Sequence, residues 1–275
     1  MLTETFQSIV TATRNVFRNW QSMLLIAAVY ASLLALLYLF VSIKEATLVQ
    51  VILTFAFAVI APLLFFILQA MIAGSSASQQ LTAGFLLRKS LASFWKLILI
   101  SLPLIVLAIL IAYLLSRAQN YFGQHINETI ATTHPMAATA NTPPARPINW
   151  RVALFSTIRY LSFGLVLPLM AIHLWLATVH DGLGGAFRKF ATLLSRAFAP
   201  QSVLIYIAGF LVFAVAPYFL LFKTTQSSRA WLELSFLVAR LLLVFALTLF
   251  GWTITVRALA RFSSNPPPEP APEAA

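Results

Sequence analysis

WQSMLLIAAVYASLLALLYLFVSI, the stretch from Trp20 to Ile43, contains no charged side chain. An α-helix rises about 1.5 Å per residue, so about twenty apolar residues cross a hydrocarbon core of about 30 Å. The stretch is longer than the apolar region of about 7–15 residues in a signal peptide, so we expect an uncleaved first span. Comparable runs predict further spans at about 48–72, 95–116, 152–178, 203–222 and 230–256.

The composition supports a membrane protein. Hydrophobic residues make up 60% of the 275 residues and charged residues only 9%, against about 25% charged residues in soluble domains. We therefore expect an all-α, polytopic transmembrane helical bundle with six spans, in a single domain over residues 1–262. The long hydrophilic stretch 117–151 is predicted to be a largely irregular outer loop with room for a short helix near 119–130, and the proline-rich residues 263–275 a disordered tail.

The formal net charge of +11 has two interpretations. It could indicate nucleic-acid binding, but basic residues in short loops between apolar spans more often set membrane orientation. The richer set of Lys and Arg falls on one side of the predicted membrane, at Arg14, Arg18, Arg88, Lys89, Lys96, Arg188, Lys189, Arg196, Arg257 and Arg261. The poorer set falls on the other, at Lys44, Arg117, Arg146, Arg151, Lys223 and Arg229. We therefore predict a bacterial inner-membrane protein with both termini in the cytoplasm and no nucleic-acid partner.

Basic amphipathic segments precede three pairs of spans and begin near Leu2, Leu81 and Leu183. This predicts three repeats of an amphipathic helix followed by a helical hairpin. The first helix, over residues 2–19, either lies in the headgroup plane or packs under the bundle. The predicted contacts with anionic lipid headgroups are Arg14, Arg18, Arg88, Lys89, Arg188 and Lys189.

The repeated pattern is clearest where GFLLRK at 84–89 corresponds to GGAFRK at 184–189. This six-span layout resembles a group of bacterial membrane proteins that includes the membrane domain ahead of some glycerophosphodiester phosphodiesterases. The resemblance implies a helical membrane module without catalytic residues of its own. Because this sequence contains no soluble phosphodiesterase domain, we carry none of that activity over.

Motifs for chemistry are missing from the sequence. There is no cysteine, which excludes disulfides, thiol catalysis and thiolate metal sites. No HExxH motif, EF-hand loop or P-loop is present. His173 and His180 stand too far apart along one helix to share a metal, so we expect core or interfacial histidines. We therefore predict no enzyme activity, no cofactor and no metal.

Charges inside the predicted spans are the remaining candidates for a site. Arg159 and Arg240 lie within spans, and Glu233 precedes Arg240 by about two helical turns on the same helix face. A charge near the bilayer centre is costly and needs a partner. Arg159, Glu233 and Arg240 are thus either the lining of a polar cavity that holds an anionic group or a structural ion pair beside an arginine that reaches the surface.

Two functions follow from these features. The first is a non-catalytic membrane scaffold or subunit, with the lipid bilayer and either a protein partner or further copies of itself as partners. The alternative is a permease or lipid-handling protein that binds an anionic group through its intramembrane arginines. A membrane-embedded enzyme is the weakest alternative, since no paired acids, metal cluster or activated nucleophile is present.

Overall fold

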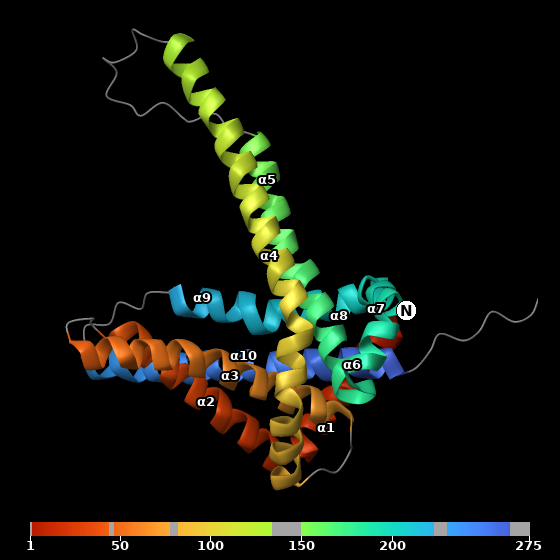
Figure 1. Cartoon of the computed structure of the whole chain (residues 1–275). Helices are drawn as coiled ribbons and strands as arrows, with labels where there is room; N and C mark the ends of the chain where they lie inside the picture. Colours follow the sequence, from red (N-terminus) through yellow and green to blue (C-terminus); the bar gives the residue numbers. More distant parts are fainter. Residues whose placement is uncertain (1, 44–46, 78–81, 134–149, 223–229, 265–275) are drawn as a thin grey trace, which may run out of the picture. The chain divides into compact units, whose positions relative to one another are not determined.

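A computed structural model describes residues 2–43, 47–77, 82–133, 150–222 and 230–264, and every regular element in those ranges is helical (Figure 1). Most of the predicted tail and residues 134–149 of the predicted loop lie outside the described residues. The helices are α1 (Leu2–Arg18), α2 (Trp20–Ser42), α3 (Leu48–Ala77), α4 (Ala83–Thr133), α5 (Trp150–Leu161), η1 (Ser162–Val166), α6 (Leu167–Arg188), α7 (Phe190–Ala197), α8 (Pro200–Phe210), η2 (Leu211–Val215), α9 (Ala216–Phe222) and α10 (Ala230–Ser264).

Within the described ranges, six helical stretches are long and apolar enough to cross a membrane. The all-α, six-span prediction is therefore confirmed. The fourth stretch is built from α5, η1 and α6, and the fifth from α8, η2 and α9. The six stretches are Trp20–Ser42, Leu48–Ser76, Ala83–Tyr121, Ala153–Arg188, Pro200–Phe222 and Trp231–Phe262.

Two predicted boundaries are wrong. The amphipathic segment that begins near Leu81 is no separate helix, because α4 runs without interruption for 51 residues from Ala83 to Thr133. The same helix takes up the first half of the stretch 117–151, which was predicted to be a loop. No proline lies between Pro103 and the end of α4. This part of the chain therefore lacks the residue that most strongly breaks a helix. A hydrophilic composition indicates that a segment is exposed to water. It does not by itself end a helix.

Two π-helical turns precede prolines in the fourth and fifth spans. The Leu167 N–H donates to the Ser162 carbonyl just before Pro168, and the Ala216 N–H donates to the Leu211 carbonyl just before Pro217. Proline lacks an N–H and clashes with the carbonyl four residues earlier. The wider i→i+5 turn accommodates this locally, so each span continues as a helix past its proline.

The chain divides into two compact units. The smaller is Ser101–Pro168 and the larger combines Met1–Ile100 with Leu169–Ala275. In the smaller unit α4 and α5 lie side by side, and Gln119 Nε2 donates to Ser156 Oγ over 3.5 Å (Figure 1). The predicted single domain over residues 1–262 stays a prediction.

Helix α10 is the centre of the larger unit, where α1, α3, α8, η2 and α9 all pack against it. Its contact with α8 and η2 depends on two glycines. A Cβ on Gly209 would overlap the side chain of Thr255, and a Cβ on Gly251 would lie 2.9 Å from Phe213 Cβ. Gly209 thus faces Thr255 while Phe213 faces Gly251, so the two segments run antiparallel at close range.

Two hydrogen bonds join α3 to α10. Trp252 Nε1 donates to Gln69 Oε1 over 2.9 Å, and Arg257 Nη2 donates to Ser75 Oγ over 3.1 Å. Because both residue numbers increase from the first bond to the second, α3 and α10 run parallel. The carboxyl-terminal ends of these two helices therefore lie at the same end of the unit.

Candidate functional site

The three residues of the predicted anion site do not lie in one compact unit. Arg159 is an exposed residue in the last turn of α5, in the smaller unit. Glu233 is exposed in the first turn of α10 and Arg240 is partly exposed farther along it, both in the larger unit. Neither unit by itself therefore contains the predicted three-residue site.

The basic residues predicted to contact lipid lie at the surface of the larger unit. Arg14, Arg18, Arg88, Arg188 and Lys189 are exposed and Lys89 is partly exposed. Each of the three segments also exposes a phenylalanine next to its basic residues, namely Phe17, Phe85 and Phe187, with exposed fractions of 66%, 55% and 56%. Exposed aromatic rings beside cations are typical of helices that lie at the membrane–water interface.

Helix α1 packs on the bundle, which is one of the two alternatives that the sequence left open. Ala12 and Val16 are fully buried, and the helix packs on both α8 and α10. Phe6 and Phe17 on its other faces remain exposed, although Phe17 also stacks on Phe250 of α10 with ring centroids 5.8 Å apart. The helix is thus attached to the bundle by small side chains and presents a separate apolar and basic surface outward.

Lys189 has a carboxylate partner. Its Nζ lies 2.8 Å from Asp181 Oδ2, and the pair spans Gly182, whose φ of 75° and ψ of 176° interrupt α6. Both side chains are substantially exposed, at 61% and 38%, so the pair contributes at most about 1 kcal/mol. Lys189 is therefore less available to lipid phosphates than its neighbour Arg188.

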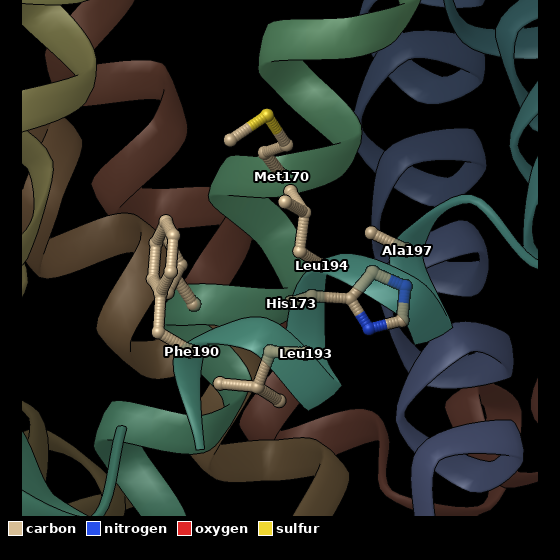
Figure 2. A pocket seen from close by; sticks show the side chains of 7 residues that line it. Met170, His173, Phe190, Leu193, Leu194 and Ala197 are labelled. Atoms are coloured by element: carbon tan, nitrogen blue, oxygen red, sulfur yellow. The ribbon is translucent and has the colours of Figure 1, made fainter. Parts of the chain in front are cut away.

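A small pocket lies between α6 and α7 (Figure 2). One lining residue is His173, which is 1% exposed and has no hydrogen-bond partner for either ring nitrogen among the described residues. The space holds roughly one water molecule. None of the predicted site residues lines it; the lining residues are Met170, His173, Leu174, Phe190, Leu193, Leu194 and Ala197. A polar residue inside the apolar run LMAIHLWLA was the signal in the sequence for this position.

Arg257 is the residue whose environment the sequence analysis predicted wrongly. It was counted among the charges outside the spans, yet it is only 4% exposed. The reason is that α10 continues to Ser264, so Arg257 lies in a part of the helix that still packs against its neighbours. Its Nη2 donates to Ser75 Oγ, while its Nε has no hydrogen-bond partner. Ser75 in turn donates its own proton to the Ile72 carbonyl over 2.8 Å.

Comparisons with known proteins give no further guidance. No protein-family model, curated protein or solved structure matches this chain. Within the described residues, no group of three or more His, Cys, Asp or Glu side chains lies close enough together to hold a metal ion. The features that bear on function are therefore the six apolar helical stretches and the cationic side chains.

Proposed function

We propose that this protein is a non-catalytic integral membrane module, a scaffold or a subunit of a larger assembly, whose amphipathic helices lie on anionic lipid. The observation that carries the proposal is the recurrence of an exposed phenylalanine beside exposed basic residues at Phe17, Phe85 and Phe187. Phenylalanine inserts into the interface and the cations attract anionic headgroups, at about 1 kcal/mol for each basic residue.

The proposed location is the bacterial inner membrane, with both termini in the cytoplasm. The larger number of Lys and Arg residues on that side supports this orientation. The resemblance to six-span bacterial membrane domains is also consistent with a module that positions other components. Large apolar side chains remain exposed along the spans, for example Val41 at 80% and Phe55 at 70%, and these faces are available to lipid or to a partner helix.

Reconstitution tests the lipid part of this proposal. The purified chain is placed in bilayers of phosphatidylcholine with increasing phosphatidylglycerol, and its thermal unfolding is followed. We expect stability to increase with the anionic fraction, and the increase to shrink when Arg18, Arg88 and Arg188 are all replaced by Gln. Equal stability in all bilayers would contradict the proposal.

Extraction in native membrane discs tests the assembly part. We expect the chain to leave the membrane in a particle that contains further protein, either a different partner or additional copies of the chain. A single chain that moves lipids or solutes across a vesicle membrane would instead favour a permease or lipid-handling protein.

That alternative depends on Arg240, which is only partly exposed within the apolar length of α10. An arginine at such a position is costly and commonly serves a substrate or ion pathway. Arg240→Leu separates the two functions. A permease loses transport, whereas a scaffold keeps its assembly and its stability.

A further inference from the structure

An incompletely bonded polar layer lies around Arg257. Its Nε is buried without a hydrogen-bond partner, and so is Oγ1 of Thr253, one helical turn earlier on the same face of α10. Both atoms can donate a hydrogen bond, since the guanidinium Nε–H is a donor and a hydroxyl donates as well as accepts.

These residues lie at one end of the larger unit. Ser75 is close to the end of α3 at Ala77, and Arg257 is about two turns before the end of α10 at Ser264.

The charge of Arg257 has no described counter-charge. Only Asp181 and Glu233 are acidic among the side chains that the structure describes, and Asp181 is bonded to Lys189. Glu233 lies about 36 Å away along α10 at about 1.5 Å per residue. Arg261, one turn beyond Arg257 on the same face, adds a second positive charge nearby. A buried positive charge without a counter-charge is strongly unfavourable. A bound anion would therefore stabilise Arg257 in this position.

We propose that the ends of α3 and α10 form a phosphate-binding site centred on Arg257, and that the phosphate belongs to an anionic membrane lipid. A guanidinium binds two oxygens of one phosphate through a planar fork, which Nε and a terminal nitrogen provide. The hydroxyl of Thr253 supplies an additional donor. The position near helix ends corresponds to headgroup depth, where basic pockets between transmembrane helices bind anionic headgroups.

Entry requires a local rearrangement, since only 4% of Arg257 is exposed. The phosphate has to displace neighbouring side chains at this end of the unit. The inference uses the proposed function only to assign the site to the inner leaflet. The site itself depends on residues that differ from the exposed lipid-contact set.

Native mass spectrometry of the full chain in detergent tests the site, with phosphatidylglycerol and phosphatidylcholine as probes. We expect the wild-type chain to retain at least one phosphatidylglycerol, and Arg257→Gln to weaken that binding about tenfold or more, as the loss of a charge-assisted fork predicts. Thr253→Val should weaken it less. Arg117→Gln removes the same charge from an exposed position outside the proposed lipid-contact set and is the matched control, expected to change the affinity by less than about twofold.

If Arg257→Gln does not fold, Arg257→Lys still tests the site, because lysine keeps the charge but lacks the planar fork. We expect Arg257→Lys to bind with intermediate affinity. Equal affinities for wild type, Arg257→Gln and Arg257→Lys would overturn the inference. If the Arg117→Gln control loses as much lipid as Arg257→Gln, binding is a general surface attraction; this overturns the site but leaves the proposed function intact.

Inorganic phosphate distinguishes the two sources of the anion. If millimolar phosphate leaves the bound phosphatidylglycerol in place, the lipid is the ligand, as proposed. If phosphate releases the lipid from wild type, and phosphate does not raise the thermal stability of Arg257→Gln, the anion site at Arg257 is supported. Free phosphate is then its ligand.

Discussion

The indole Nε1 of Trp252 donates a 2.9 Å hydrogen bond to Oε1 of Gln69, which lies 183 residues earlier in the chain. Gln69 is 4% exposed, so its amide has little access to water. The bond fixes the register of α3 against α10 at a level where Trp252 also meets Phe213 edge to face, with ring centroids 5.1 Å apart.

We expect Gln69→Leu and Trp252→Phe each to lower the free energy of unfolding, because each leaves a buried polar partner unsatisfied. The double variant should cost less than the sum of the two, with a coupling of about 0.5–1.5 kcal/mol, as for other hydrogen bonds between transmembrane helices. A double-mutant cycle by denaturant unfolding in micelles measures this. Strictly additive effects would show that the two side chains do not interact.

Gly209→Ala and Gly251→Ala should each destabilise the protein by about 1–3 kcal/mol, since the added methyl group enters space already filled by α10 or η2. For Gly251 the new Cβ would lie 3.2 Å from both the backbone nitrogen and Cα of Phe213, so the neighbour has little freedom to move. Thermal unfolding in detergent detects the change.

Gly184→Ala is the control for both glycine variants. It lies in helix α6 with no atom within 4 Å of the added Cβ. We expect a neutral effect or a gain of about 0.4–1 kcal/mol from the reduced entropy of the unfolded chain. If all three variants behaved alike, close helix packing would not explain the two glycines.

Gly182→Ala should cost about 1–3 kcal/mol, because a φ of 75° with a ψ of 176° is accessible almost only to glycine. Lys189→Gln removes the ion pair across the same turn and should cost less than about 1 kcal/mol, an effect that decreases further in high salt. Chemical denaturation at low and high ionic strength separates the two. A larger loss for Lys189→Gln than for Gly182→Ala would mean that the ion pair, and not the backbone, holds the turn.

His173→Leu should leave the protein as stable as wild type or more stable, since it removes two buried ring nitrogens that have no described partner. His180→Leu, seven residues later and exposed, is the control and should change little. Unfolding in detergent gives the comparison. A loss above about 2 kcal/mol in His173→Leu would instead indicate that the imidazole holds a bound water or ligand in the pocket of Figure 2.

The sequence was sufficient for features that depend on how far an apolar run extends. The six spans follow from hydrophobic length, because lipid thickness imposes a simple requirement on each helix. The basic residues were predicted to be at the surface from their positions in the amphipathic segments. In the structure the exposed ones include Arg14, Arg18, Arg88 and Arg188. The helix ends were harder to predict, since a helix such as α4 continues past the apolar region into residues that favour water.

Which polar groups meet, and which have no described partner, depends on the packing of helices that are distant in the chain. In the sequence, Arg257 is one more cation after a span, whereas in the structure it is buried beside Ser75 of α3. Arg159 was grouped with Glu233 and Arg240 from its depth in a different span, and depth does not determine which helices are neighbours. Hydrophobicity is a property of each segment alone, whereas a buried charge acquires its partners from helices that are distant in the chain.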